Sequence, residues 1–325
     1  MTRTAEEAKG ARSFSPLPRP GVRPHTQQHT HTHTHTRTHT HTHTHTHRPS
    51  PLLPPPPPPP LTITTVTSPN PAWTPGTPCP HPFTGAAAAI RTYHTATTPA
   101  STLYPLVISS IIPRPIALVS SLGTDGSRNL APFSYFGVMS HDPPVVTIGT
   151  CATSGRPNRM KDTQQNVAET GEFVVNLVSE WMLEAANHTC GFFDRGVDEM
   201  ALAGLTPLAS VSVRPPRVAE CAVQMECVLE GSHPVVNAAG LETANILIGR
   251  VVALHVLEGV LGPTAVPGRD VVDPAALAPV SRLGGDTYAR ITQVYDLPRP
   301  GKEWQERRAG AVAVAVGVAQ GGGGG

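Results

Sequence analysis

The sequence is poor in aromatic and charged residues: of its 325 residues, 5% are aromatic and 14% are charged. The formal net charge is +1, so the chain lacks the excess of positive charge that attracts nucleic acid or an anionic membrane. No apolar run reaches the length of a membrane span, because Arg250, His255 and Glu258 interrupt the best one. We therefore expect neither a nucleic acid nor a membrane as a partner.

Cysteine is also scarce. The five cysteines form no CxxC pair and no metal-ligand spacing, so no metal site is predicted. Their odd number, and the absence of an apolar signal region after Met1, predict a reduced compartment and a cytoplasmic location. The arginine- and hydroxyl-containing start leaves an organelle such as the mitochondrion as the alternative, although Glu6 and Glu7 argue against a transit sequence.

Several common catalytic motifs are missing. The chain has no GxGxxG after a predicted strand, no GxxxxGK[ST], no HExxH and no GxSxG. These absences exclude the ordinary dinucleotide fingerprint, the P-loop, the zinc-protease helix and the serine nucleophile elbow. No catalytic acid, base or nucleophile is predicted.

The first hundred residues differ from the rest in composition. Residues 1–100 hold 20 of the 37 prolines, a His-Thr alternation from His29 to His47 and a proline run from Pro54 to Pro60. Such a segment cannot bury a core, so residues 1–100 are predicted to be disordered and of low complexity. The histidines could chelate a transition metal, but a repeat in the coding sequence gives the same pattern, and we favour that reading. Residues 101–300 suit one domain, and residues 301–325 are predicted to be a flexible tail.

The most informative segment runs from Arg114 to Phe136 and predicts a β-hairpin. Apolar residues at 116–119 predict a buried strand, residues 123–126 (GTDG) supply turn chemistry, and residues 129–136 (NLAPFSYF) are predicted to return as a second strand. This second strand carries a hydroxyl, backbone amides beside a proline, and aromatic rings. That combination suits a planar, aromatic anion.

Strand patterns outnumber helical ones in the remainder of the domain. Further strands are predicted at 145–150, 172–178, 218–229 and 245–257. Two prolines are expected to hold the entry to the first of these strands extended, and Gly249 is expected to mark a bulge in the last. Short helices are predicted at 160–168 and 180–187. The fold class is therefore mainly β, with a closed or nearly closed antiparallel barrel.

Donors suited to an anion gather on two segments that are predicted to be neighbours. Hydroxyls, amides, cations and a helix amino end can together share the charge of a phosphate dianion. The same residue types also serve as caps, turn residues and solvated loop cations, so the residues alone leave both readings open. The donors are Asn129, the backbone near Ala131, Ser134, Thr150, Ser154, Arg156, Lys161 and Thr163.

An ordered series of motifs resembles the flavin reductase-like family of FMN-binding split-barrel proteins. That family includes reductase components of two-component monooxygenases and flavoredoxin-like proteins. The resemblance covers about residues 103 to 290. Its motifs are RPIALVSS at 114–121, DG at 125–126, NLAPFSYF at 129–136, DPP at 142–144, KDT at 161–163, GEFVVN at 171–176, VDE at 197–199, PRV at 216–218, EC at 226–227, His255, and RLGG at 282–285 with Tyr288.

The resemblance implies an antiparallel Greek-key split β-barrel with short added helices, a homodimer, and FMN bound near the dimer interface. Residues of 129–136 would lie along the flavin, residues of 154–163 would serve its phosphate, and Arg114 would contact the cofactor or stabilise the loop. The roles of Arg282 and Tyr288 stay open between structure and flavin contact. The predicted cofactor-binding residues are Arg114, Asn129, Ala131, Ser134, Phe136, Thr150, Ser154, Lys161, Asp162 and Thr163.

The resemblance also implies an activity, that of an NAD(P)H-dependent flavin reductase. NADH or NADPH would donate a hydride to FMN, and the protein would supply position and electrostatic support rather than a general base. A monooxygenase or another electron acceptor is a possible partner. The alternative is an FMN-binding electron carrier or flavin-handling protein without direct nicotinamide use, and a third is a dimeric scaffold that has lost flavin.

Overall fold

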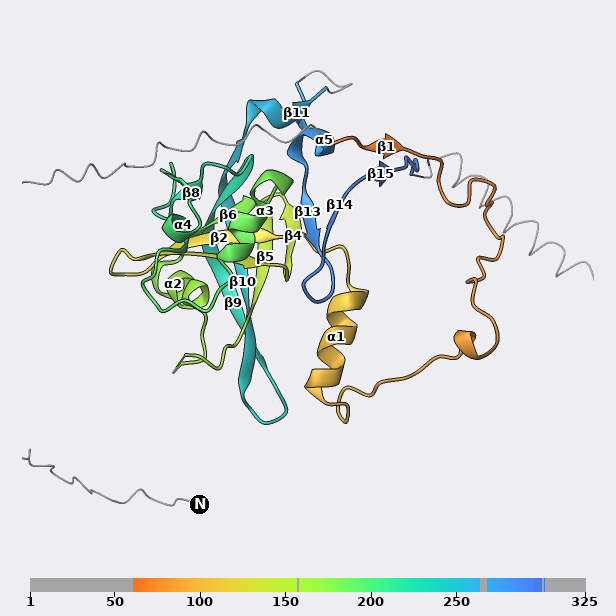
Figure 1. Cartoon of the computed structure of the whole chain (residues 1–325), viewed down its shortest axis with the longest axis horizontal. Helices are drawn as coiled ribbons and strands as arrows, with labels where there is room; N and C mark the ends of the chain where they lie inside the picture. Colours follow the sequence, from red (N-terminus) through yellow and green to blue (C-terminus); the bar gives the residue numbers. More distant parts are fainter. Residues whose placement is uncertain (1–60, 157, 264–267, 300, 302–325) are drawn as a thin grey trace, which may run out of the picture. The chain divides into compact units, whose positions relative to one another are not determined.

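The computed structural model describes residues 61–156, 158–263, 268–299 and 301 (Figure 1). The His-Thr and proline runs of the predicted disordered region lie outside the described residues, as does the predicted tail beyond Gly301. Residues 61–99 are mostly exposed and carry strand β1 (Thr64–Thr65) and the 3₁₀ helix η1 (Gly85–Ala88). Strand β1 pairs in parallel with β15 (Gln293–Val294). The domain boundaries drawn from the sequence stay predictions.

A seven-stranded antiparallel sheet forms the domain. Its hydrogen-bonded order is β3-β2-β6-β9-β10-β5-β4. The strands are β2 (Ala117–Leu122), β3 (Arg128–Phe133), β4 (Phe136–His141), β5 (Pro144–Cys151), β6 (Glu172–Leu177), β9 (Val223–Val236) and β10 (Glu242–Val256). Shorter pairs join β7 (Pro207–Leu208) to β8 (Arg217–Val218), β11 (Leu261–Gly262) to β12 (Val271–Val272), and β13 (Val280–Arg282) to β14 (Tyr288–Arg290).

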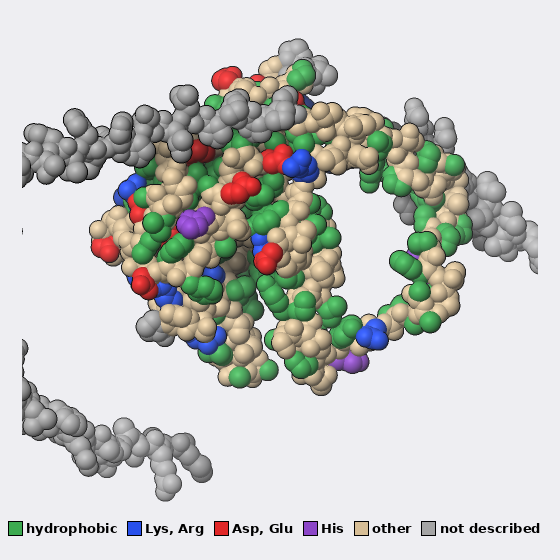
Figure 2. All heavy atoms as spheres, viewed as in Figure 1, with side chains coloured by type: hydrophobic (Ala, Val, Ile, Leu, Met, Phe, Trp, Pro, Cys, Tyr) green, Lys and Arg blue, Asp and Glu red, His purple; other side chains and the backbone are tan. Residues whose placement is uncertain are grey.

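The helices are few and short. The longest, α1 (Ala100–Ser110), carries no charged residue, and Figure 2 accordingly shows its side chains as hydrophobic or uncharged. No helix among the described residues is long and apolar enough to cross a membrane. The others are α2 (Asp162–Thr170), η2 (Glu180–Met182), α3 (Leu183–His188), α4 (Glu199–Leu202), η3 (Glu258–Val260) and α5 (Pro274–Leu277).

Strand β2 is buried on both faces. Successive side chains of a strand point to opposite faces, and here each face packs into a core of its own. Leu118 joins Met182 and Met200 from the η2–α3 and α4 side, whereas Val119 joins Val167 of α2. A strand covered on both sides needs a continuous apolar run, which explains the sequence at 116–119.

The predicted hairpin is confirmed at its first strand and its turn. The amide of Gly123 donates to the carbonyl of Ser127 at 2.8 Å, and Gly126 has φ +83°, a conformation that favours glycine. The single second strand predicted at 129–136 is wrong, because β3 ends at Phe133 and the chain bends at Ser134 and Tyr135 into β4. Strand β4 was not predicted, since its pattern does not alternate: neighbouring Val138 and Met139 are both exposed.

Only one of the two prolines at the entry to β5 is placed as predicted. Asp142 and Pro143 form the turn of the β4–β5 hairpin, whereas Pro144 is extended as the first residue of β5.

The other predicted strands and helices agree with the structure within a few residues, except that β9 begins at Val223 and runs on to Val236. The short elements α4, β7, β8, β11, β12, α5, β13 and β14 were not predicted. The β9–β10 register shifts between Ile248 and Gly249, the position predicted for a bulge, but the extra residue, Glu230, lies on β9.

The fold is mainly β and its main sheet is antiparallel, as predicted. Hydrogen bonds do not, however, close this sheet into a barrel. Strands β3 and β4 are its two edges, so the closed form of the predicted barrel is not found in the part of the chain that the structure describes. Both edges nevertheless contribute to one core, through Phe133 and Phe136. The bend between them brings the carbonyl of Tyr135 within 2.7 Å of the amide nitrogen of Gly149 on β5.

Candidate functional site

Two adjoining cavities lie beside the edge strand β3. The first has a volume of about 320 Å³ and the second of about 250 Å³. Both are lined by Pro132, Lys161 and Cys190. Their combined size falls in the range of a pocket for a cofactor-sized ligand.

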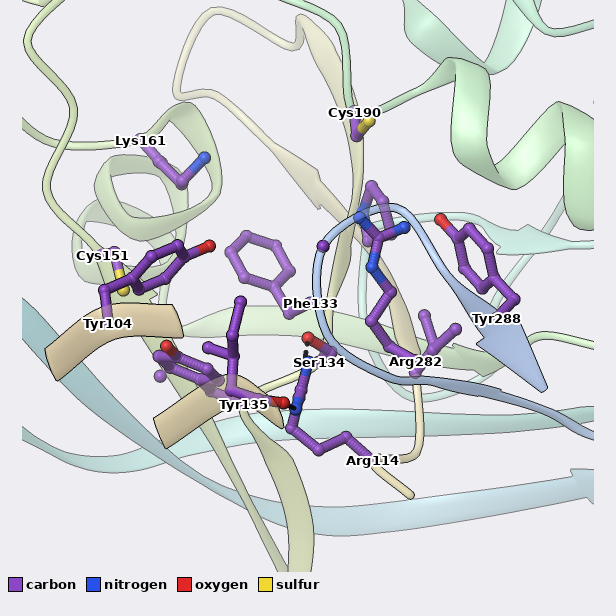
Figure 3. Close-up of a pocket in the computed structure, with 15 residues that line it drawn as sticks. Tyr104, Arg114, Phe133, Ser134, Tyr135, Cys151, Lys161, Cys190, Arg282 and Tyr288 are labelled. Atoms are coloured by element: carbon purple, nitrogen blue, oxygen red, sulfur yellow. Dashed lines mark hydrogen bonds between the residues drawn. The ribbon is translucent and has the colours of Figure 1, made fainter. Parts of the chain in front are cut away.

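The first cavity is rich in aromatic side chains. Phe133 of β3 and Tyr135 of the following bend line it together with Tyr104 of α1 and Tyr288 of β14 (Figure 3). Gly149 lies under Tyr135, and a Cβ built on Gly149 would lie 3.0 Å from Cβ of that tyrosine. Flat rings around an open volume suit a planar aromatic ligand.

The second cavity is polar. Asn129 of β3 donates through Nδ2 to Oγ1 of Thr163 at 2.8 Å, and both residues are buried. Thr163 belongs to the first turn of α2, where unpaired backbone amides point outward and favour an anion. The cavity is completed by Ala131, Thr153, Gly155, Arg156, Asp162, Thr189, Gly191, Phe192, Phe193, Asp194 and Glu199.

Asp162 organises the cations near the second cavity. Its carboxylate accepts from Arg156 on one oxygen and from Arg195, at 3.4 Å, on the other. Arg156 donates further to the carbonyl of Phe193 at 2.9 Å. The side chain of Lys161 has no hydrogen-bond or ion-pair partner among the described residues, although Lys161 lines both cavities. Its ammonium group is thus the donor with most capacity left for a ligand.

Glu199 places a buried carboxyl group at the wall of the second cavity. Its Oε2 accepts from the amide of Leu130 at 3.0 Å. Desolvation raises the pKa of Glu199 above its ordinary value, against the opposing effect of the Leu130 amide. The carboxyl group therefore holds its proton at higher pH than an exposed glutamate does.

Three other titratable groups in the first cavity stay neutral over a wider pH range than usual. Desolvation raises the pKa of Tyr135, of Tyr288 and of the Cys151 thiol. At neutral pH these groups bear no charge, so the charge in this cavity is set by its cations.

Arg114 is 7% exposed and acts as a clamp. Its guanidinium donates to the carbonyl of Ile108, to that of Ile111 at 2.8 Å and to that of Leu283 at 2.6 Å. Its Nε lies 3.4 Å from Oγ of Ser134. Arg114 therefore ties the end of α1 to the loop after β13, and the two segments together form one wall of the first cavity.

Most of the predicted cofactor-binding residues line the cavities. Arg114, Ser134 and Lys161 line the first cavity, and Lys161 also lines the second. The residues of the second cavity also include Asn129, Ala131, Asp162 and Thr163. Their binding of a cofactor stays a prediction.

Three predicted residues lie elsewhere. Phe136 packs against the core, and Ser154 does not line either cavity. Thr150 is fully buried and donates to Gln164 at 3.2 Å and to the carbonyl of Asn245 at 3.1 Å. Thr150 therefore stabilises the contact between β5, β10 and α2 instead of facing a cavity.

Several lining residues were not predicted. Tyr104 lies on helix α1, which was not predicted, and no local motif marks this residue. The segment Gly191–Asp194 lines the second cavity and was not among the predicted site residues. Arg282 and Tyr288, whose roles were left open, face the first cavity with the guanidinium carbon 4.4 Å from the ring centre.

Comparison with known proteins identifies the family. The family model described as "Flavin reductase like domain" matches residues 109–273, about half of the chain. The chain belongs to the flavin reductase-like family. It is an oxidoreductase, and the resemblance drawn from its motifs is confirmed.

Comparison with individual proteins supports this family assignment. The chain is 40% identical over 197 residues to the uncharacterized protein YwrF of Bacillus subtilis, covering 61% of this chain and 93% of that one. Nitrilotriacetate monooxygenase component B from Bacillus cereus is 35% identical, with a TM-score of 0.59 and coverage of 64% of this chain and 99% of that one. The 2-nitrobenzoate 2-nitroreductase NbaA of Pseudomonas fluorescens is 28% identical, with a TM-score of 0.55 and coverage of 65% and 96%.

The range matched by the family model includes some parts of the structure of this flavin reductase-like protein and leaves out others. Residues 109–273 contain all seven strands of the main sheet and the whole lining of the second cavity. The first cavity is different, because Tyr104 precedes this range, and Arg282 and Tyr288 follow it.

Proposed function

We propose that the protein is an FMN-binding, NAD(P)H-dependent flavin reductase. The flavin ring would lie in the first cavity and the phosphate of its side chain in the second. The observation that carries this proposal is the meeting of an aromatic cavity and a polar cavity at Lys161. An aromatic ring system joined to a phosphate needs both environments side by side.

The donor set of the second cavity fits a phosphate. Lys161 has unused donors, and the first turn of α2 adds backbone amides beside Thr163. Asp162 would act indirectly, because its carboxylate already accepts from Arg156 and Arg195 and so fixes these two cations. Asn129 would hold the Thr163 hydroxyl in place from the opposite side.

The residues of the first cavity would position a flat ring and exclude water from it. Phe133, Tyr104 and Tyr135 present apolar ring surfaces, and Gly149 leaves space for Tyr135. When bound, FMN supplies the redox chemistry, accepting a hydride from NADH or NADPH. The protein would contribute orientation and positive potential, so no dedicated acid or base is assigned.

The proposal includes the type of barrel, the oligomeric state, the location and the electron acceptor. The open antiparallel sheet, with its edges β3 and β4 joined by a two-residue bend, supports a Greek-key split barrel. We also propose a cytoplasmic homodimer that passes electrons to a monooxygenase or another acceptor. The likeness to a monooxygenase component, at 35% identity, supports such an acceptor.

The test is the visible spectrum of the full-length protein before and after nicotinamide is added. Purified protein should be yellow or become yellow with added FMN, and anaerobic NADH or NADPH should bleach it rapidly. A yellow protein that neither nucleotide bleaches would be an FMN-binding carrier. A protein that takes up no FMN would overturn both flavin functions and leave the scaffold.

A further inference from the structure

Among the residues that the structure describes, three cationic residues and no aspartate or glutamate line the first cavity. They are Arg114, Lys161 and Arg282. The pKa values of Tyr135, Cys151 and Tyr288 are raised by desolvation, so none of these groups adds negative charge at neutral pH. A cavity with this charge balance selects an anion.

The three cations differ in how their donors are used. Arg114 donates to three backbone carbonyls and has little capacity left. Lys161 is shared with the polar second cavity, where it would serve the flavin phosphate. Arg282 makes one side-chain hydrogen bond among the described residues, to Asp286 at 3.3 Å, and Asp286 is fully exposed, so solvent screens the pair.

The position of Arg282 is fixed by Tyr288. The guanidinium carbon lies 4.4 Å from the centre of the Tyr288 ring, a cation–π arrangement. The hydroxyl of Tyr288 in turn donates to Oδ1 of Asn187 on α3 at 2.8 Å. A guanidinium held on one face by a ring keeps its edge free, and that edge is the part that pairs with a carboxylate or phosphate in bidentate fashion.

We propose that the Arg282–Tyr288 pair is an anion subsite for the second ligand of the cavity, a planar aromatic compound that carries an anionic group. This subsite is separate from the flavin-phosphate site, because Arg282 and Lys161 lie on either side of the Phe133 ring (Figure 3). The proposal rests on the proposed function, since the second ligand is the compound that exchanges electrons with the flavin. Two kinds of ligand combine a planar ring with an anionic group in this way: an aromatic carboxylate, and a nicotinamide dinucleotide with its pyrophosphate.

The test uses the full-length protein and three variants. Arg282→Gln removes the charge, Arg282→Lys keeps the charge but loses the planar fork, and Arg290→Gln is the matched control. Arg290 is a cation on the same β13–β14 hairpin, 58% exposed and paired with Glu180 outside both cavities. Calorimetric titration with sodium benzoate, NADH and FMN measures each affinity. Benzoate is titrated with and without FMN, and NADH only without FMN, because bound FMN would oxidise it.

For the ligand that uses the subsite, Arg282→Gln should raise the Kd about tenfold, Arg282→Lys should raise it less, and Arg290→Gln should leave it unchanged. If Arg282→Gln loses affinity for benzoate alone, the second ligand is a carboxylate. If it loses affinity for NADH alone, the second ligand is the dinucleotide. FMN affinity should change less than the affinity for that ligand in Arg282→Gln. Unchanged affinity for both ligands in Arg282→Gln would overturn the subsite, and so would a loss of FMN affinity as large as the loss for the second ligand. If wild type binds no FMN, the proposed function fails, while the flavin-free titrations still decide whether Arg282 binds an anion.

Discussion

The ring of Phe173 occupies the space that a side chain at position 249 would need. A Cβ built on Gly249 would lie 2.3 Å from Cζ of Phe173, which is fully buried. Phe173 lies on β6 and Gly249 on β10, two strands that flank β9. The glycine therefore lets the sheet curve tightly around the larger ring, at the point where the β9–β10 register shifts.

Gly249→Ala should lower the free energy of unfolding by about 1–3 kcal/mol, because the new methyl group overpacks the core at Phe173. Urea unfolding measures the change. Adding Phe173→Leu to the same chain should recover part of the loss, since the smaller side chain vacates the space. Gly259→Ala is the control, because a Cβ there would have nothing within 4 Å. Equal stability of Gly249→Ala and wild type would contradict the close packing.

Lys161→Ala should weaken FMN binding by about tenfold or more, because it removes the cation with unused donors from the meeting point of the two cavities. Quenching of flavin fluorescence measures the affinity, and circular dichroism checks that the fold is intact. Arg159→Asn is the matched control: it removes a charge from the same loop, and asparagine tolerates the positive φ of 60° found there. Unchanged FMN affinity in Lys161→Ala would remove this residue from the phosphate site.

Glu199→Gln should change stability in a pH-dependent way. Burial raises the pKa of Glu199, so the folded protein holds a proton that the unfolded chain has already lost, and stability falls as pH rises through the ordinary glutamate value towards the folded one. Glutamine has no such proton and can still accept from the Leu130 amide. Its Tm should therefore exceed that of wild type at pH 8 and match it below about pH 4.

The control for this titration is Glu184→Gln, which removes an exposed carboxylate from α3. Thermal unfolding at several pH values should give parallel curves for this variant and wild type. A Glu199→Gln curve that also runs parallel to wild type would show that Glu199 does not titrate differently in the folded and unfolded states.

Arg114→Gln should loosen one wall of the first cavity, because three backbone carbonyls lose their donor. We expect faster hydrogen exchange in residues 103–111 and 283–287, and a loss of about 1–3 kcal/mol in the free energy of unfolding. Arg128→Gln, which breaks a half-buried ion pair with Asp198 outside both cavities, is the control. Weaker FMN binding with unchanged exchange would instead make Arg114 a direct contact of the cofactor.

The sequence predicts the elements whose signals are local. The apolar run at 116–119 and the GTDG turn are enough for the β2–β3 hairpin, and the KDT motif lies where α2 begins. Strand β4 was not predicted, because Val138 and Met139 are neighbouring apolar residues that are both exposed, so apolar and polar residues do not alternate along it. Closure of a barrel could not be decided from strand patterns, because it depends on whether the two edge strands pair with each other.

The site residues also fall into those that local motifs predict and those that only the fold brings together. Asn129, Lys161 and Thr163 belong to motifs whose order in the chain is informative, and they meet in the second cavity. Tyr104 and Tyr288 reach the first cavity from segments far apart in the chain, and no periodicity connects them. Their meeting depends on Arg114, whose hydrogen bonds to Leu283 and to the end of α1 are visible only in three dimensions.

Most of the wall that Arg114 holds together, in α1 and after β13, lies outside residues 109–273, whereas the main sheet lies inside that range. Mutations at the exposed positions of α1 or of residues 283–287 should therefore leave the strands of the main sheet in place, whereas Val280 packs in one core with Leu118 of β2. Two relatives with nearly the same sheet are then free to differ in what they accept. Exchanging both flanking segments between such relatives, together with the arginine that joins them, should transfer that preference as a unit.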